Sequence, residues 1–96
     1  MTADIILVPD EFILYPNYPN PFNPVTTLRY TLPSESAVQI AVFDILGREV
    51  TALVNEVQTP GEHLVQWDGD QFKSGVYFVR METDSKILMQ KVLLLK

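Results

Sequence analysis

Short runs in which apolar and polar residues alternate follow one another along most of the chain. In residues 26–32, Leu28, Tyr30 and Leu32 alternate with polar residues, which is the period-two pattern of a half-buried β-strand. Similar runs recur about every ten residues, a spacing typical of an all-β domain. The pattern predicts seven strands: residues 12–15, 26–32, 38–42, 49–54, 63–67, 76–82 and 86–95.

Turn-forming residues separate these runs. Four prolines fall within residues 16–24 and exclude a helix there, because proline fixes φ and lacks a backbone N–H. Asp44 and Gly47 occupy the first and last positions of a type I turn, which predicts a hairpin. Residues 49–56 are the nearest rival for a helix, but they are short and uncapped. Seven short strands joined by turns predict an antiparallel β-sandwich.

The last run, residues 86–95, has apolar residues at both odd and even positions, so they cannot all lie on one face of a strand. A strand covered on both faces, or one that docks onto a partner, would explain this composition. We expect Trp67 in the core and Phe72 as a plug at the end of the sandwich. Residues 1–11 show no sustained periodicity and are predicted to form a linker or arm, with a short strand at Ile5–Val8.

Composition narrows the class of protein. The chain has 96 residues, 47% of them apolar, which suits one compact domain. The formal net charge of -5 argues against a nucleic-acid partner. Cysteine is absent, which excludes disulfides and thiolate metal sites. Ile5–Val8 is too short for a signal peptide or a membrane span, so either the protein is cytosolic or its export signal lies elsewhere.

Charge is unevenly distributed along the chain. Residues 1–24 carry acids and no Lys or Arg, whereas residues 85–96 carry Lys86, Lys91 and Lys96 and no acid. Lysines protect a strand edge from pairing with other chains, and they can equally be recognised by a binding partner. Both interpretations stay open at this point.

Candidate chemistry is sparse. His63 is the only imidazole and lies in phase with Val65 and Trp67 on a predicted strand, so we expect a packed or edge histidine rather than a catalytic base. Asp68-Gly69-Asp70 lacks the order of a calcium loop. We therefore predict no catalytic residues, no metal and no cofactor. A carbohydrate-stacking platform of Tyr15, Tyr18, Phe22 and Trp67 is the rival interpretation, and we weigh core packing above it.

Several motifs together resemble a known family. Residues 18–24 read Tyr-Pro-Asn-Pro-Phe-Asn-Pro, residues 44–48 read Asp-Ile-Leu-Gly-Arg, residues 67–69 read Trp-Asp-Gly, and residues 74–78 read Ser-Gly-Val-Tyr-Phe. In this order, the chain resembles the type A C-terminal sorting domain of the bacterial type IX secretion system, which is similar to the immunoglobulin-like domain of flagellar hook-cap proteins. The motif residues given a structural role are Pro19, Asn20, Pro21, Phe22, Asn23, Pro24, Asp44, Gly47 and Trp67.

The resemblance covers residues 12–96 and implies a seven-stranded immunoglobulin-like β-sandwich. It further implies an exported protein in which an upstream cargo domain crosses the periplasm and then an outer-membrane translocon. The translocon would recognise the folded domain through Gly75, Val76, Tyr77, Lys91 and Lys96. A surface protease of sortase-like function would cleave before Phe12. The alternative is a structural or carbohydrate-binding accessory module of a cell-surface protein or glycoside hydrolase.

Overall fold

The computed structural model describes residues 9–96. Most of the predicted arm, including the short strand expected at Ile5–Val8, lies outside the described residues. Within them the strands are β1 (Ile13–Leu14), β2 (Val25–Leu32), β3 (Ser36–Phe43), β4 (Glu49–Gln58), β5 (Gly61–Asp68), β6 (Gly75–Glu82) and β7 (Ile87–Leu94). No helix long and apolar enough to cross a membrane occurs in this part of the chain.

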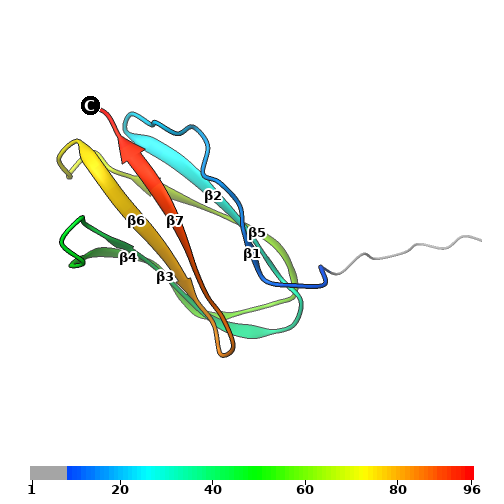
Figure 1. Ribbon diagram of the computed structural model, residues 1–96. Coiled ribbons are helices and arrows are strands. Elements are labelled where there is room, and N and C mark those ends of the chain that lie inside the picture. Colours follow the sequence, from blue (N-terminus) through cyan, green and yellow to red (C-terminus); the bar gives the residue numbers. More distant parts are fainter. Residues whose placement is uncertain (1–8) are drawn as a thin grey trace, which may run out of the picture.

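The strands form two antiparallel sheets that pack face to face (Figure 1). One sheet has the order β1-β2-β5 and the other the order β4-β3-β6-β7. In the constant-type immunoglobulin fold the fourth strand belongs to the first sheet, whereas here β4 pairs with β3 in the second. The predicted antiparallel β-sandwich of seven strands is confirmed for the described residues.

The core follows the alternation that the sequence predicted. Leu28, Tyr30 and Leu32 of β2 are fully buried and face Val38 and Val79 of the opposite sheet in one cluster. Because side chains alternate along a strand, β2, β3 and β6 each contribute every second residue to this cluster, whereas β5 contributes only Trp67. The eight-pair ladder between β2 and β5 joins strands about thirty residues apart, so the core depends on long-range pairing.

β4 contains two bulges. Its register with β3 shifts twice, which leaves Val50 and Leu53 without a partner directly opposite. Both side chains are half-buried and pack against the core. Each bulge inserts a residue and so changes which positions point toward the core. The apolar residues Val50, Leu53 and Val54 therefore lie three and then one position apart. The spacing that made residues 49–56 a rival for a helix therefore comes from a bulged strand, which extends to Gln58 beyond the predicted end at Val54.

β7 lies at an edge of its sheet and is covered on one face only. Val92 and Leu94 are buried, but Ile87 is 61% exposed and Met89 is 58% exposed. The expectation that the chain itself covers both faces is wrong, because Ile87 and Met89 point away from the other sheet. Docking onto a partner stays a prediction.

Candidate recognition surface

The proline-rich segment before β2 closes the end of β7. The Phe22 N–H donates to the Leu93 carbonyl (3.0 Å) and the Leu95 N–H donates to the Phe22 carbonyl (2.9 Å). The Leu93 N–H donates to Asn20 Oδ1 (3.1 Å). Figure 1 shows this segment, blue to cyan, beside the red tip of β7. Two segments about seventy residues apart in the sequence therefore form one structural unit.

A buried polar cluster anchors the same segment to β2. Asn17 is buried, and its Nδ2 donates to Thr26 Oγ1 (3.0 Å) and to the Pro19 carbonyl (3.3 Å). Thr26 Oγ1 donates to the same Pro19 carbonyl (2.8 Å). Sequence reasoning missed both residues, because an Asn among prolines predicts only a turn and Thr26 is the first residue of a predicted strand.

An aromatic cluster fills the sandwich beneath this segment. Trp67 packs against Phe22, Phe72 and Tyr77 with ring centroids 5.2, 5.6 and 5.3 Å away. Phe22 and Trp67 are each only 2% exposed. The stacking-platform interpretation is therefore wrong, since the faces of Phe22 and Trp67 are covered by protein. Trp67 in the core and Phe72 at the end of the sandwich agree with the sequence predictions.

Gly69 explains the small residue in the Trp-Asp-Gly motif. A Cβ at this position would lie 3.0 Å from Leu94 Cδ2 and 3.3 Å from Phe22 Cε2. Its N–H donates to the Pro24 carbonyl (2.7 Å). Because Leu94 and Phe22 are both buried, any larger residue at this position would force their side chains to shift.

Three of the predicted recognition residues begin β6 and face the end of β7. Gly75 pairs with Leu94, Val76 with Leu93, and Tyr77 with Val92. The Tyr77 side chain points into the core, and its hydroxyl donates to the Lys73 carbonyl (2.6 Å). Val76 lies half-buried on the opposite side of β6. A partner at this surface would therefore contact Val76 and the backbone rather than the Tyr77 ring.

The two predicted lysines differ in their environment. Lys91 is exposed on β7 opposite Phe78. Lys96 instead folds back, and its Nζ donates to the carbonyls of Asp70 (2.5 Å) and Phe72 (3.1 Å). Its N–H donates to Ser74 Oγ (2.9 Å). Lys96 thus holds the β5–β6 loop, while the Lys91 ammonium faces solvent.

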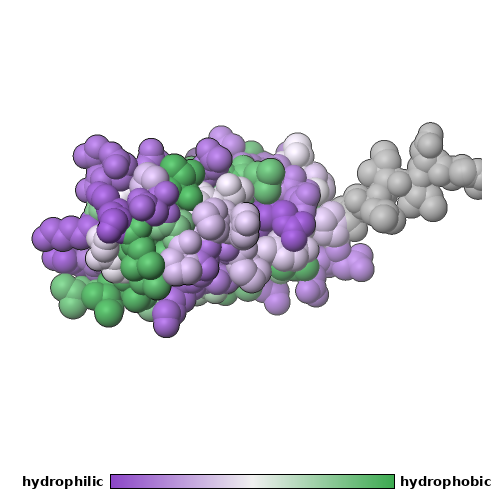
Figure 2. All heavy atoms as spheres, turned by 90° about the horizontal axis from the view of Figure 1, so that it is seen from above, coloured by the Kyte–Doolittle hydropathy of each residue, from purple (hydrophilic) through white to green (hydrophobic). Residues whose placement is uncertain are grey.

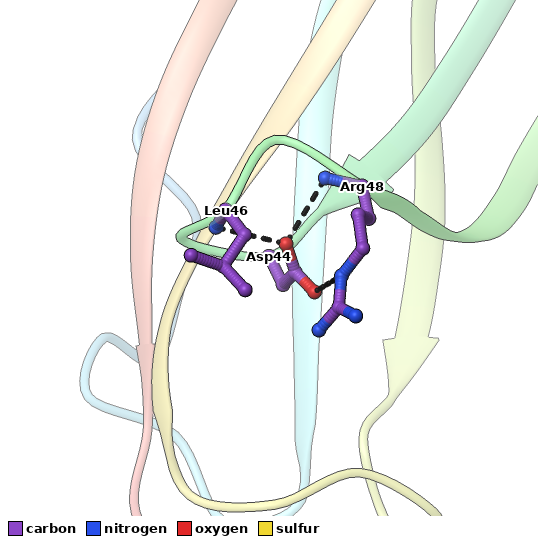
Figure 3. A network of polar contacts seen from close by, with 3 residues as sticks. All are labelled: Asp44, Leu46 and Arg48. Carbon is purple, nitrogen blue, oxygen red and sulfur yellow. Dashed lines mark hydrogen bonds and ion pairs between the residues drawn. The ribbon is translucent and has the colours of Figure 1, made fainter.

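Asp44 holds the β3–β4 turn through its carboxylate (Figure 3). Oδ1 accepts hydrogen bonds from the N–H groups of Leu46 (2.9 Å) and Arg48 (3.0 Å), and Oδ2 accepts one from Arg48 Nε (2.9 Å). The Arg48 N–H above all, and then the Arg48 side chain and the Leu46 N–H, lower the pKa of Asp44 despite partial desolvation. Gly47 has a φ of +82°, a conformation that favours glycine. The predicted turn and the roles of Asp44 and Gly47 in it are thus visible in the structure.

This rigid turn displays two large aliphatic side chains. Ile45 is 72% exposed and Leu46 is 73% exposed. A shallow depression of about 330 Å³ lies between the turn and the start of β6, lined by residues 44–46, 48 and 74–77. The Asp44 motif and the predicted recognition residues of β6 therefore share one surface, although they are about thirty residues apart.

Apolar side chains continue across the outer face of the same sheet. Phe43, Ile45, Phe78 and Met89 line a second depression of about 270 Å³. The Arg80 guanidinium lies 4.5 Å from the centre of the Phe43 ring. Figure 2 shows green apolar side chains gathered mostly toward the end of the molecule away from the grey trace. The sequence analysis offered docking of the last run onto a partner, but it missed the contribution of Phe43, Ile45 and Phe78 to this face.

His63 has a packing role in the structure. Its ring stacks on Tyr30 with centroids 5.4 Å apart, and Nε2 lies 2.8 Å from the Thr59 carbonyl. Burial raises the pKa of the Tyr30 phenol, an effect opposed by its hydrogen bond to Gln58 and reinforced by Glu56. No group of three or more His, Asp or Glu side chains arranged for a metal occurs in residues 9–96. The packed histidine agrees with the sequence prediction.

Comparison with known families gives a match over most of the chain. A family model described as a secretion system C-terminal sorting domain matches residues 16–95. The match spans the proline-rich segment and β2 to β7, and β1 lies outside it. Comparisons with curated proteins and with solved structures gave no match.

Proposed function

The chain belongs to the family of C-terminal sorting domains of the type IX secretion system, and we propose that an outer-membrane translocon recognises it in its folded form. Membership implies a larger polypeptide that is exported to the cell surface or the extracellular space. The cargo lies upstream and crosses the periplasm first. The domain acts by being recognised and performs no reaction of its own.

One observation supports recognition of the folded state above all others. The proline-rich segment, the Asp44 turn, the start of β6 and the end of β7 are separate in the sequence and contiguous only after folding. A receptor that serves many cargoes needs a surface set by backbone and shape. We propose that this surface includes Gly75, Val76, Tyr77, Lys91 and Lys96.

We also propose a division of the chain into a linker, residues 1–11, and the sorting domain, residues 12–96. A surface protease would act in the linker, where cleavage leaves the sandwich intact. The hydrogen bond from Thr31 Oγ1 to the Glu11 carbonyl (3.0 Å) supports this boundary, because it ties the chain to β2 just before β1.

The test is an export assay in a bacterium that has a type IX system. A periplasmically targeted reporter is fused upstream of residues 1–96, and its surface or extracellular fraction is measured. The fusion should be exported, while the reporter alone stays in the periplasm. Deleting residues 91–96 should trap the fusion, although this deletion also removes the buried Leu94 and Val92 and so tests folding as well.

A charge variant separates recognition from folding. Lys91→Gln removes one exposed positive charge and should lower export, because a partner that reads this lysine loses its counter-charge. The matched control is Gln66→Glu, which changes net charge by the same amount at an exposed position of the other sheet. Equal export of the wild-type fusion and the reporter alone would refute the proposed function. Equal export of the Lys91→Gln and Gln66→Glu fusions would show that Lys91 is not part of the recognition surface.

A further inference from the structure

β7 has an edge that is closed at one end and open at the other. Leu93 and Leu95 direct their N–H groups away from β6, toward Asn20 and Phe22. Backbone groups alternate along an antiparallel strand, so Met89 and Lys91 direct theirs to the same side. No strand of residues 9–96 pairs with β7 there. From Ile87 to Lys91 this edge therefore has no strand hydrogen-bonded to it among residues 9–96, although β1 of the other sheet lies close to β7.

The other edges differ in geometry or charge. β4, at the opposite edge of the same sheet, is interrupted by two bulges, which hinder pairing with another chain. β1 has only two residues. β5 is regular, but it carries Glu62 and Asp68 and no Lys or Arg. β7 pairs with β6 in an unbroken register and combines Lys91 with the neighbouring Lys86, both exposed.

The side chains beside this edge suit an apolar contact flanked by positive charge. Ile87 and Met89 lie on the outer face, exposed by 61% and 58%. Met89 pairs with Arg80 and Lys91 with Phe78 across the β6–β7 ladder. The whole chain carries a net charge of -5, so a basic, apolar edge is a local departure from its overall charge.

We propose that the β7 edge from Ile87 to Lys91 binds an extended, acidic and apolar segment of a partner protein, which adds a fifth strand to the β4-β3-β6-β7 sheet. The inference rests on the proposed function and names the kind of segment that the sorting machinery presents. Main-chain hydrogen bonds to Met89 and Lys91 hold the added strand. Its apolar side chains cover Ile87 and Met89, and its carboxylates pair with Lys86 and Lys91. The Asn20–Phe22 closure at Leu93 fixes where the added strand ends.

A peptide titration tests the edge directly on the 96-residue protein. The probe is a synthetic ten-residue peptide of alternating glutamate and valine, and backbone amide shifts are followed by NMR. Shifts should concentrate at Ile87–Lys91 and at the facing residues of β6, and they should weaken as salt is raised. A peptide of alternating lysine and valine is the charge control and should give no such shifts.

Two variants locate the contact. Met89→Pro removes an N–H that points away from the β6 ladder, so the fold should keep its thermal midpoint while binding falls at least about tenfold. Lys91→Glu keeps the backbone and reverses the charge, so it should weaken the acidic peptide by about tenfold and improve the lysine peptide. If Met89→Pro does not fold, the edge proposal is judged by Lys91→Glu alone, which should bind the lysine peptide better and the acidic peptide worse than wild type.

Failure of this inference is distinguishable from failure of the proposed function. If wild-type and Met89→Pro fusions are exported equally and the acidic peptide shifts no β7 amide, the edge proposal is overturned and the sorting function stands. If the peptide binds the edge as expected but the wild-type fusion is never exported, the sorting function fails and the edge stands. Peptide shifts centred on β5 or β4 would also overturn the assignment to β7.

Discussion

Asp44 shows how one side chain organises a turn. Its carboxylate accepts three hydrogen bonds from Leu46 and Arg48, and the backbone adds a bond from the Gly47 N–H to the Asp44 carbonyl (2.9 Å). The Arg48 side chain is largely exposed, so its ion pair with Asp44 contributes little by itself. The bonds to backbone N–H groups hold the turn because they favour the ionised carboxylate.

A pH dependence follows from the lowered pKa of Asp44. A group whose folded pKa is depressed stabilises the fold above its ordinary pKa, here 3.8, and this stability is lost as the pH falls through the folded value. Asp44→Asn should therefore lower the urea midpoint at neutral pH, and the difference from wild type should shrink as the pH drops below about 4.

The matched control for this prediction is Asp84→Asn in the exposed turn between β6 and β7. It removes one negative charge, as Asp44→Asn does, but the Asp84 carboxylate accepts no hydrogen bonds like those described for Asp44. Asp84→Asn should therefore lower the urea midpoint less than Asp44→Asn. A difference between wild type and Asp44→Asn that stays constant from neutral to acidic pH would contradict the assignment to carboxylate ionisation.

Among the elements, β4 departs most from a regular strand. The two bulged residues Val50 and Leu53 pack against the core, while Val57 further along is 63% exposed. The bulges therefore let an edge strand bury side chains that a strict period of two would expose. They also leave this edge poorly suited to pairing with another chain.

The bulge assignment predicts unequal costs for two similar truncations in β4. Leu53→Ala removes half-buried apolar surface and should lower the free energy of unfolding by about 1–2 kcal/mol. Val57→Ala removes exposed surface and should change it by less than about 0.5 kcal/mol. Equilibrium urea unfolding measures both, and equal costs would mean that Leu53 is not directed at the core.

At the scale of the whole molecule, the aromatic cluster joins the two sheets at the end that carries the family motifs. Trp67 of β5 contacts Tyr77 of β6, Phe72 of the β5–β6 loop and Phe22 of the proline-rich segment. Lys96 fastens that loop to the chain beyond β7. Four parts of the sequence therefore depend on one indole ring for their mutual position.

Removal of this ring should affect stability before any other property. Trp67→Ala should cost about 3–5 kcal/mol, a large fraction of the stability of a small domain. Trp67→Phe should cost less, because it keeps an aromatic ring and removes a buried indole N–H without a hydrogen-bond partner among the described residues. Equilibrium urea unfolding measures both variants, and a Trp67→Ala variant as stable as wild type would contradict the role given to this ring.

Much of the architecture could be predicted from local pattern. The positions of β2, β3, β6 and the core faces followed from alternation, and the Asp44–Gly47 turn followed from its residue types. The bulges of β4 could not be predicted, because an extra residue imitates a helical spacing when the partner strand is unknown. The burial of Asn17 could not be predicted either, because its partner Thr26 comes near it only when the proline-rich segment folds back on β2.

The sequence alone determined that the chain forms short strands, that Trp67 is internal, and, through the order of its motifs, which family it belongs to. Only the tertiary structure decided that the proline-rich segment closes one end of β7 and leaves the other open, that Lys96 is bound while Lys91 is exposed, and that the Asp44 turn shares a surface with β6. The physical reason is that strand formation depends on neighbouring residues, whereas edges, surfaces and hydrogen-bond partners depend on pairing between segments far apart in the chain.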